Sequence, residues 1–591
     1  MKQDLDNLRH SCAHLLAAAV MDLWPEAKRT IGPSIENGFY FDFDFGKVKI
    51  SETDLPAIEK KMHEIVKDWK SFTKHELLEE EAKKEYPGNE YKHELIKEFS
   101  EGEKKKLTFY KSGNYWDLCL GGHINNPNKN LKYFKLLSIA GAYWRGSEKN
   151  KMLTRIYGTC FPTKKELDNY LKQQEEAKKR DHRKLNQALK IYQASDEIGQ
   201  GLITLLPNGA VIAQELEKWA IETEDKWGYV RVYTPHIVPE KLFKTSGHVP
   251  YYVASMFPPM RMAEKNKEET EVFYIKPMNC AGHHMVYKSE PRSYRDLPLR
   301  IAEYGTVYRY EQSGELHGMM RVRGPIHQND AHIFCTEEQA EEEFQKVMEL
   351  HQYYYDKLGL DKKDYYLSFA VRDPKNKEKF IGGDMLWEKA EAIALKFIKK
   401  TKIPYQIEAG GAAFYGPKID FNIKTVTGKA FSASTNQLDF FLPRAFGLTY
   451  IDKDGKEKTP VCIHRAPLGA HVRFIAFLME HFAGNFPTWL TPVQVKVLPI
   501  TDRNIAYGTE VLKKLRTQGL RVELDDRNET LQAKIRDAQL EKVSYMLIVG
   551  DREEKDEMVS LRKRNGKDLG QVQIEKFIKD IKKEINEKVI N

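Results

Sequence analysis

The stretch MNCAGHH, residues 278–284, brings together residue types that bind transition metals. Cys280 stands three residues before His283, and His284 follows directly. Thiolate and imidazole are ligands that Zn²⁺ prefers. A free cysteine is also among the most frequently buried residues, so a plain packing role explains Cys280 equally well. The local pattern leaves both interpretations open, because a metal site would need partners from elsewhere in the chain.

Arginine and glutamate alternate in VYRYEQSGELHGMMRVRG, residues 307–324. Arg309 and Glu311 are two residues apart, as are Arg321 and Arg323. This spacing predicts two antiparallel strands that present these side chains on one face. Guanidinium groups match the oxygens of a polyphosphate. Cross-strand Arg/Glu salt bridges are the alternative, and the spacing alone does not decide between them.

A further arginine follows a glycine in CIHRAPLGAHVRFIAFLMEHF, residues 462–482. Gly469 precedes a predicted helix that carries Arg473 in its early turns. A helix N-terminus is itself a favourable phosphate site, so an arginine there strengthens the case for an anionic ligand. Upstream, a long helix predicted over 208–226 runs into a strand that we expect to end at Pro235.

Two more pairs of metal-binding residue types lie near the N-terminus. His10 and His14 are four residues apart on a helix predicted over 4–24, so they share one face. Cys119 and His123 repeat that offset in DLCLGGH. A single histidine pair on a helix is usually incidental, but two such pairs form a four-ligand set of the kind that binds zinc.

The bulk composition narrows the class of protein. The 591 residues suggest several domains, and the formal net charge of +8, from 94 basic and 86 acidic residues, permits an anionic partner without requiring one. Six scattered cysteines favour a reducing compartment. The polar N-terminus lacks a signal-peptide core, and no apolar run reaches the roughly 20 residues of a membrane helix. We therefore expect a soluble cytoplasmic protein with no membrane partner.

The elements that must position these residues fall into four segments, expected at 1–163, 164–190, 191–490 and 491–591. The first reads as an α+β domain, with a strand at 39–45, a charged helical stretch at 51–86 and short strands and turns after it. The second contains neither Gly nor Pro and predicts one exposed linker helix, whose basic residues suit a solvated face or passing RNA. The last alternates buried strands with amphipathic helices, as in an α/β domain with a mostly parallel sheet.

Three segments of the third region resemble the signature motifs of class II aminoacyl-tRNA synthetases: the helix 208–226 with its strand, the R-x-E strand–loop–strand, and the Gly-then-Arg helix. More closely, nearly the whole chain resembles the threonyl-tRNA synthetase family, through KPMNCAGH, SYRDLPLRIAEYG, LHGMMRVRG, NDAHIF, AAFYGPKID, NQLDF and CIHRAPLG in this order. The resemblance implies an α+β editing domain, a linker helix, a class II catalytic domain built on an antiparallel sheet with flanking helices, and a C-terminal α/β anticodon-binding domain.

The resemblance also implies a zinc ion in the catalytic domain, held by Cys280, His332 and His464, with His283 and His284 not assigned to it. Three protein ligands leave zinc an open position. Threonine can bind there through its amino group and hydroxyl. Valine lacks the hydroxyl, and a site built to bind that group can reject such an analogue by roughly 10⁴-fold or more.

The same resemblance assigns the ATP contacts. Arg309 would hold the α-phosphate, Glu311 would receive the adenine amino group, and Arg321 and Arg473 would hold the γ-phosphate side. Mg²⁺ would bridge the phosphates. The expected reaction is attack of the threonine carboxylate on the α-phosphate, followed by transfer of the threonyl group to the terminal ribose of tRNA(Thr).

Five further residues are expected around the amino acid and the adenylate. Gln328, Asp330 and Tyr415 would orient the hydroxyl and amine of threonine. Lys418 and Gln437 would line the adenylate pocket.

Serine makes a second site necessary, because it lacks only the methyl group of threonine, which is worth roughly 10–200-fold in discrimination. HSCAHLL, IGPSIENGFYFDF, DLCLGGH and AGAYWRGSEKNKMLTRIYGT look like the editing domain shared by threonyl- and alanyl-tRNA synthetases. The implied seryl-tRNA hydrolysis site comprises His10, His14, Asp117, Cys119 and His123. We prefer water activation or substrate orientation by the histidines there, with a bound zinc as the alternative.

In the C-terminal domain, the charge run Arg562, Lys563, Arg564 and Lys567 would contact tRNA, with solvated surface as the alternative. A homodimer is expected, because the first class II motif forms a dimer interface in the family.

The chain departs from the family pattern at three places. Val472 stands where the third motif usually has Glu, so a metal or hydrogen-bond contact of that carboxylate is not expected. Leu120 and Gly121 stand where the family often has Arg and Gly. The small N-terminal domain of many bacterial relatives is expected to be absent, since the editing segment begins almost at Met1.

Three other functional classes conflict with these features. The phosphate arginines and the metal triad argue against a silent, regulatory RNA-binding paralogue. The two flanking tRNA-type domains argue against a small-molecule ligase, and the ATP motifs exclude a stand-alone seryl-tRNA hydrolase.

Overall fold

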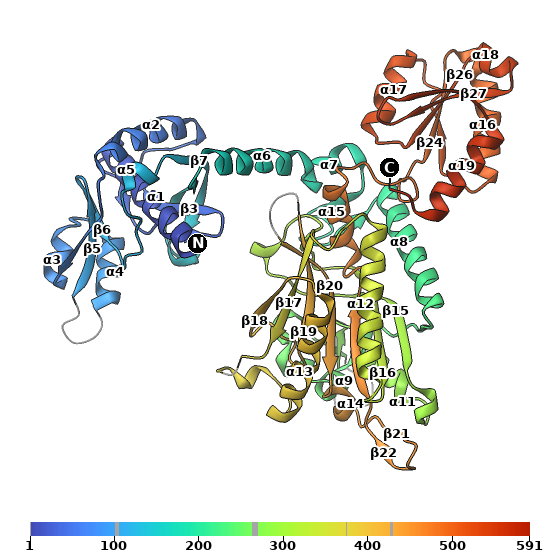
Figure 1. Ribbon diagram of the computed structural model, residues 1–591, viewed down its shortest axis with the longest axis horizontal. Coiled ribbons are helices and arrows are strands. Elements are labelled where there is room, and N and C mark those ends of the chain that lie inside the picture. The colour runs from blue at the N-terminus through green and yellow to red at the C-terminus, as the bar shows by residue number, and fades with distance from the viewer. Residues whose placement is uncertain (1, 101–105, 263–269, 374, 426–429, 591) are drawn as a thin grey trace. The chain divides into compact units, whose positions relative to one another are not determined.

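The computed structural model describes residues 2–100, 106–262, 270–373, 375–425 and 430–590 (Figure 1). The chain divides into two compact units, Met1–Gln174 and Glu175–Asn591. Within the described ranges, every helix is too short or too polar to cross a membrane. The mixture of α+β, antiparallel and α/β layers confirms the predicted fold class.

The first unit packs helix α1 (Lys2–Leu23) against an antiparallel five-stranded sheet. The sheet comprises β1 (Lys28–Arg29), β2 (Ser34–Ile35), β3 (Gly38–Asp44), β7 (Tyr133–Tyr143) and β8 (Met152–Phe161). The predicted helix over 4–24 and strand over 39–45 are confirmed. Both faces of β3 are largely buried, and its buried Asp42 is paired at 2.7 Å with Arg155, which lies directly opposite on β8. The strands β7 and β8, with 11 and 10 residues, are longer than predicted.

A second sheet of three strands completes this unit: β4 (Thr73–Leu77), β5 (Leu107–Ser112) and β6 (Tyr115–Leu118). Helices α3 (Glu79–Lys84) and α4 (Glu90–Ser100) pack against this sheet, whereas α2 (Leu55–Ile65) packs against α1 and β7 of the first sheet. A short helix, α5 (Pro127–Asn130), lies next to the segment that follows α2. The prediction that 51–86 is helical throughout was therefore wrong at 73–77. Those residues form an exposed edge strand, because their backbone pairs with β5, a partner 30 to 38 residues away that local periodicity cannot reveal.

The linker is two helices, α6 (Lys164–Arg180) and α7 (His182–Leu189), where one helix was predicted. The break lies at Asp181, whose backbone is not helical and whose side chain accepts a hydrogen bond from the Arg183 amide at 2.8 Å. Asp181 thus caps the N-terminus of a new helix, which is the role that aspartate favours over a helix interior.

The second unit is built on an eight-stranded sheet in the order β11–β15–β16–β23–β20–β19–β17–β18. These strands span Val230–Arg231, Leu299–Val307, Ile326–Cys335, Val461–Ala466, Ala430–Asp439, Lys418–Lys424, Tyr365–Val371 and Tyr405–Ala409 in that order. The outermost neighbours at each edge are parallel, and the other neighbours are antiparallel.

Four helices share a hydrophobic core with this sheet: α8 (Pro207–Lys226), α12 (Ala340–Lys357), α13 (Asp384–Thr401) and α15 (His471–His481). Helix α12 lies along the sheet over β16 and β23 (Figure 1). The predicted helix over 208–226 and the helix that carries Arg473 are confirmed. The strand before Pro235 is only Val230–Arg231, shorter than predicted.

Smaller elements complete this part of the unit. They are β9 (Tyr192–Ala194), β10 (Ile203–Leu205), β12 (Ile237–Pro239), α9 (Glu240–Thr245), α10 (His248–Tyr251), β13 (Met260–Met262), β14 (Glu271–Ile275), α11 (Cys280–Lys288), α14 (Leu442–Ala445), β21 (Tyr450–Ile451) and β22 (Glu457–Lys458).

The register of the central strands sets four polar residues in one row. His332 on β16 lies opposite His464 on β23, which lies opposite Gln437 on β20, which in turn lies opposite Lys418 on β19. Directly opposed residues point to the same face of a sheet. Gln328 and Asp330 share that face with His332, because alternate residues of a strand point the same way.

The predicted strands around the R-x-E motif were wrong: β15 ends at Val307 and β16 begins at Ile326. One backbone bond joins the two arms, from the Arg309 amide to the Arg323 carbonyl at 3.0 Å, but no continuous ladder forms, and the flanking amides bond to other segments. The amide of Tyr310 donates to Ser255 at 2.9 Å, and that of Arg323 donates to Gly201 at 2.8 Å. Residues 308–325 are therefore a supported loop, which we call the 308–325 loop.

The C-terminal sheet has the order β25–β24–β26–β27–β28, with strands at Val522–Leu524, Val495–Pro499, Tyr545–Val549, Met558–Lys563 and Asp568–Gln573. Its helices are α16 (Ile505–Thr517), α17 (Leu531–Leu540), α18 (Asp551–Lys555) and α19 (Ile574–Glu587). Two strand pairs are parallel and two are antiparallel, so the sheet is less parallel than predicted. The reason is connection length, since a parallel crossover needs about a dozen residues or more and 550–557 are too few.

Candidate functional sites

A cavity of about 440 Å³ opens on the sheet face that carries the polar row. It brings together all twelve residues that were expected to bind metal, ATP or threonine. They are Cys280, Arg309, Glu311, Arg321, Gln328, Asp330, His332, Tyr415, Lys418, Gln437, His464 and Arg473. These residues come from segments nearly 200 positions apart, so the fold assembles one site from separate motifs.

Three buried side chains in this cavity form a metal-competent group. One ligand atom each from Cys280, His332 and His464 lies within 4.8 Å of the other two. The two histidines come from neighbouring strands, and the cysteine is the first residue of α11. Sulfur with two imidazole nitrogens is a donor set that zinc favours, with a position left open for another ligand.

Hydrogen bonds fix which nitrogen of each histidine faces the site. His464 Nε2 donates to Asp439 Oδ2 at 2.9 Å, which leaves Nδ1 as its lone-pair nitrogen. His283 Nε2 donates to Glu303 Oε2 at 3.0 Å, so its Nδ1 accepts from His332 Nδ1 at 2.8 Å. The remaining His332 Nε2 is buried without a hydrogen-bond partner. Both rings thus present a lone pair to the same place, and the residues fit a zinc ion.

Glu303, the last group in this series of hydrogen bonds, stays ionised. Burial opposes the charge of Glu303, but hydrogen bonds from His283 and Thr234 and the Lys276 ammonium outweigh it and lower the pKa of Glu303 to about 2. Burial raises the pKa of the Cys280 thiol. A cation beside Cys280 would favour its thiolate form.

Three arginines, Arg309, Arg321 and Arg473, also line the cavity. Arg473, in the first turn of α15, has an Nε that is buried without a hydrogen-bond partner. Burial lowers the pKa of Arg473, and the charges of Arg309 and Arg321 lower it further. Such mutual repulsion marks a place where a polyanion is bound favourably. Its neighbour Val472, where the family usually has Glu, is buried in the hydrophobic core.

The salt-bridge alternative for the R-x-E motif also has a basis in the structure. Arg321 donates to Glu311 at 2.9 Å and to Glu315 at 3.1 Å. These pairs are partly exposed, and such pairs contribute only about 0–1 kcal/mol. Arg323 has a structural position, because it donates to the Glu311 and Gln200 carbonyls and stacks on Tyr310.

The residues expected around the amino acid also hold one another. Tyr415 donates to Gln437 Oε1, and its ring stacks on His464 with centroids 4.8 Å apart. Asp330 accepts from Asn279 at 3.0 Å, and burial raises the pKa of its carboxyl. Lys418 pairs with Asp420 at 2.7 Å.

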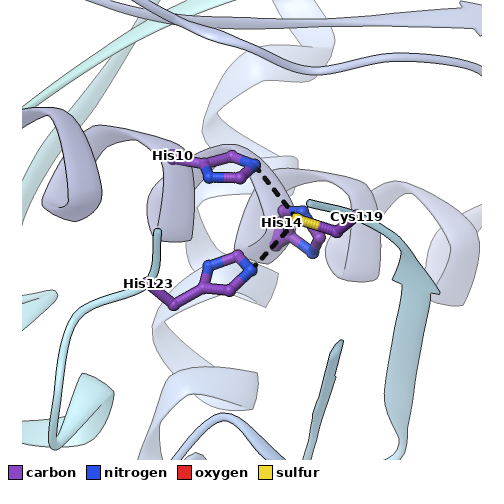
Figure 2. Close-up of side chains that lie close together, drawn as sticks. All are labelled: His10, His14, Cys119 and His123. Atoms are coloured by element: carbon purple, nitrogen blue, oxygen red, sulfur yellow. Dashed lines mark hydrogen bonds between the residues drawn. The ribbon is translucent and has the colours of Figure 1, made fainter. Parts of the chain in front are cut away.

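The first unit holds a second cluster, made of His10 and His14 from α1 and Cys119 and His123 from the segment after β6 (Figure 2). Cys119 Sγ lies 3.5 Å from His10 Nε2 and 3.3 Å from His123 Nε2. Burial lowers the pKa of His123 to about 3, helped by the charge of His10, and also lowers the pKa of His10 and His14. The three imidazoles are therefore neutral bases near pH 7.

Asp117 lies outside the hydrogen bonds of that cluster. It is buried and accepts from Tyr86 at 2.6 Å and Tyr115 at 2.9 Å, and it pairs with Lys92 at 2.8 Å. Burial opposes its charge, but Lys92 and Arg29 outweigh burial and keep its pKa well below the usual range. It acts on the histidines only through the field of its charge.

The C-terminal charge run is not uniformly exposed. Arg562 and Lys563 end β27, and Arg562 pairs with Asp568 at 3.5 Å. Arg564 donates to the Phe486 carbonyl at 2.6 Å, which places its guanidinium in a packing contact. Lys567 is exposed, so of these four it presents the freest surface for a phosphate.

Residue spacing alone missed the groups that orient His332 and His464. Asp439 follows Gln437 by two residues on β20, and Glu303 lies on β15, so strand alternation placed both toward this side of the sheet. His283 was set aside as a local residue, yet it links Glu303 to His332. Asp439 in NQLDF and Glu303 in IAEYG are visible in the sequence, but only the register across the strands shows that they lie beside the histidines.

Three family models match the chain. Residues 262–482 match the class II core domain of tRNA synthetases for G, H, P, S and T. Residues 494–584 match an anticodon-binding domain, and residues 107–157 match the second additional domain of threonyl and alanyl tRNA synthetases.

Curated relatives align with almost the whole chain. The threonine–tRNA ligase of Staphylococcus carnosus is 46% identical over 582 residues, covering 98% of this chain and 88% of that protein. The threonine–tRNA ligase of Thermotoga neapolitana is 45% identical with the same coverage. A crystal structure of the RNA-binding domain of threonyl-tRNA synthetase from Cryptosporidium parvum matches 68% of this chain and 98% of that chain, at 34% identity and a TM-score of 0.63. A putative threonyl-tRNA synthetase from Aeropyrum pernix gives 26% identity, a TM-score of 0.59 and coverage of 69% and 96%.

Proposed function

The chain belongs to the threonine–tRNA ligase family of class II aminoacyl-tRNA synthetases, and we propose that its 440 Å³ cavity selects threonine, activates it and passes it to tRNA. The enzyme attaches threonine to tRNA(Thr) with ATP and Mg²⁺, and it edits through its N-terminal domain. The observation that carries the assignment of residues is the gathering of twelve expected side chains in one cavity.

Activation joins the threonine carboxylate to the α-phosphorus of ATP and releases pyrophosphate. In this proposal Arg309 holds the α-phosphate and Arg321 and Arg473 hold the γ-phosphate side. The repulsion among these arginines is relieved when the triphosphate binds. No protein nucleophile is needed, because positioning and charge stabilisation supply the catalysis.

We assign a zinc ion to Cys280, His332 and His464. Bound there, it would supply a positive charge and an open position for the amine and hydroxyl of threonine. Asp439 and the Glu303–His283 pair keep the two histidines in the binding tautomer. Asp330, Gln328 and Tyr415 complete the pocket for the amino acid, and Lys418 and Gln437 border the adenylate.

Glu311 has two partners in this scheme. In the structure it accepts from Arg321, and we propose that it accepts from the adenine amino group once ATP is bound. The exposed ion pair is weak enough for this exchange. Arg321 then becomes available to the phosphates.

Serine is the amino acid that this pocket cannot exclude, since it has the same amine and hydroxyl as threonine. We propose that His10, His14, Cys119 and His123 hydrolyse seryl-tRNA(Thr). Imidazoles that are neutral near pH 7 keep a lone pair that can accept a hydrogen bond from the attacking water or orient the ester. Asp117, held by Lys92 and the two tyrosines, supports the cluster by position and charge. The alternative is that this cluster binds a zinc ion, because its four ligand atoms lie within 4.8 Å of one another.

We propose that the enzyme is a homodimer through the face around β12 and α11. Tyr233 is 82% exposed there, and Ile237 and Met285 are also exposed. A largely apolar cavity lies beside them. Contiguous exposed apolar surface of this kind marks an association site. Sedimentation should give twice the chain mass, and a monomer at micromolar concentration would refute this.

Two assignments concern the surroundings of the enzyme. Lys567, with Arg562, Lys563 and Arg564 around it, is proposed to face tRNA phosphates.

The cytoplasm is the proposed compartment, because all six cysteines are free and buried.

Amino-acid-dependent ATP–pyrophosphate exchange tests the proposal, with zinc measured on the same sample. We expect exchange with threonine, weaker exchange with serine and none with valine, at about one zinc per chain. Equal exchange with valine would remove the proposed role of the zinc. Absence of exchange with all three would favour a silent RNA-binding paralogue.

A further inference from the structure

The residues at the break between α6 and α7 are hydrogen-bonded to the C-terminus of α15, the helix that carries Arg473. Arg180 donates to the His481 carbonyl at 3.3 Å. His182 donates twice to Glu480 Oε1, from Nδ1 at 2.8 Å and from its backbone amide at 3.3 Å. Glu480 and His481 end α15, whose first turn holds Arg473. The linker therefore binds directly to α15, which is one of the two segments that supply the arginines proposed to bind ATP.

The other edge of the same histidine faces the second of those segments. His182 is completely buried, and its Nε2 has no hydrogen-bond partner. A Cβ added to Gly318 would lie 2.4 Å from that Nε2, so the ring packs directly on the backbone of the 308–325 loop. Only a glycine fits at this contact, and its φ of +50° also favours glycine.

The contact lies in the turn that presents Arg321. The amide of His317 donates to the Arg321 carbonyl at 3.2 Å, and that of Met320 donates to the His317 carbonyl at 2.9 Å. Gly318 is inside this closed turn, and the next residue, Met319, is fully buried. A shift of Gly318 would therefore move Arg321 rather than be absorbed by a loose segment.

We propose that His182 is a positioning residue for ATP. Its ring bridges Glu480 on α15 and Gly318 in the 308–325 loop, and so sets the separation of Arg473 and Arg321. This inference rests on the proposed roles of those two arginines in holding the γ-phosphate. If His182 were only a core residue, its loss would lower stability without a selective effect on ATP.

The first test compares His182→Ala and His182→Asn in pyrophosphate exchange by the full-length enzyme. Asparagine keeps a donor for Glu480 and removes the ring edge that faces Gly318. We expect both to raise the KM for ATP about tenfold, with the KM for threonine within about twofold, since misplacement by about 1 Å can cost up to 100-fold. Lys184→Ala, an exposed change on the same helix, is the matched control and should leave both KM values unchanged.

The second test uses the close contact itself. Gly318→Ala should raise the KM for ATP about tenfold, because the new Cβ meets His182 and the backbone is strained. In the His182→Asn background the clashing atom is gone, so the added effect of Gly318→Ala should fall to about threefold or less. Effects that simply multiply would overturn the bridge, as would a lower melting temperature with an unchanged KM for ATP.

Arg321→Ala separates this inference from the function on which it rests. If Arg321→Ala leaves the KM for ATP unchanged, the proposed phosphate role fails. If Arg321→Ala raises it but both His182 variants leave it unchanged, the positioning role fails while the phosphate role stands. If His182→Ala does not fold, the KM values of His182→Asn and Gly318→Ala decide whether His182 has the positioning role.

Discussion

The molecule contains two clusters of cysteine and histidine whose side chains are alike and whose surroundings differ. In the 440 Å³ cavity, His464 donates to Asp439, and His332 is linked through His283 to Glu303. In the N-terminal cluster, His123 bonds to the Ser11 hydroxyl, while His10 and His123 contact the Cys119 thiol. Among the described residues, no carboxylate accepts a hydrogen bond from those N-terminal rings.

This difference indicates what each cluster can do. A carboxylate behind an imidazole fixes its tautomer and raises its basicity toward a metal, as in many zinc sites. Neutral histidines that have no carboxylate partner in the described part of the chain, and that contact a thiol, a hydroxyl, aromatic rings and one another, keep nitrogen atoms that can accept a hydrogen bond from water. The two clusters thereby suit two selection problems. A metal can distinguish the hydroxyl of threonine from the methyl of valine, whereas serine must be removed by hydrolysis.

The largest expected effect comes from removing the thiol of each cluster in turn. Cys280→Ala should abolish zinc binding and lower threonine-dependent exchange at least about 100-fold, more than the loss of an orienting group costs. The same variant should hydrolyse preformed seryl-tRNA(Thr) at the wild-type rate. Cys119→Ala is the matched variant and should give the reverse pattern, with full exchange and slow hydrolysis.

Zinc content distinguishes the two readings of the N-terminal cluster in the same experiment. Cys119→Ala should keep about one zinc per chain, as in the wild type. A drop from two to one would show that the N-terminal cluster also binds the metal, and the contrast between the clusters would then be lost.

An intermediate effect is expected from the carboxylate behind His464. Asp439→Asn should weaken zinc binding about 10- to 100-fold, because the amide no longer supports the imidazole as the carboxylate does. Asp439 Oδ1 also accepts from the amides of Phe441 and Leu442, and an amide oxygen can still serve there, so the fold should persist. Competition with a chelator measures the affinity. Asp117→Asn, next to the N-terminal cluster, should leave the zinc affinity unchanged. An equal loss of zinc affinity in both variants would contradict the role assigned to Asp439.

Local sequence predicted the elements whose apolar periodicity is visible over a short stretch. The helices α1 and α15 and the strand β3 follow from apolar spacing, and the buried residues confirm those patterns. The 308–325 loop was predicted as a pair of strands, because alternation is all that the sequence displays there. Its backbone bonds to Gly201, Ser255 and Lys276, which lie about 30 to 120 residues away, and no short-range signal encodes such partners.

The site residues divide in the same way. Their identities came from a resemblance in motifs, whereas their arrangement depends on strand register. The opposition of His332, His464 and Gln437 is a property of three strands that are not consecutive in the chain. His283 illustrates the limit. Three residues after Cys280 it resembles a metal ligand, and only the positions of Glu303 and His332 show that both of its nitrogens are taken by hydrogen bonds.

The smallest expected effect is a pH dependence that comes from His123 in the N-terminal cluster. The pKa of His123 is about 3 in the folded protein and 6.5 in the unfolded chain. Between these values the unfolded chain binds more protons, so stability is complete above pH 6.5 and is lost as the pH falls toward 3. From pH 8 to pH 6, His123 alone should lower the folded-to-unfolded ratio of this unit about fourfold. Hydrogen exchange of α1 peptides, corrected for intrinsic rates, measures this, and His123→Gln should remove that share. If chelator changed the pH profile of the wild type, a bound metal rather than burial would be keeping these histidines neutral, and the two clusters would be alike after all.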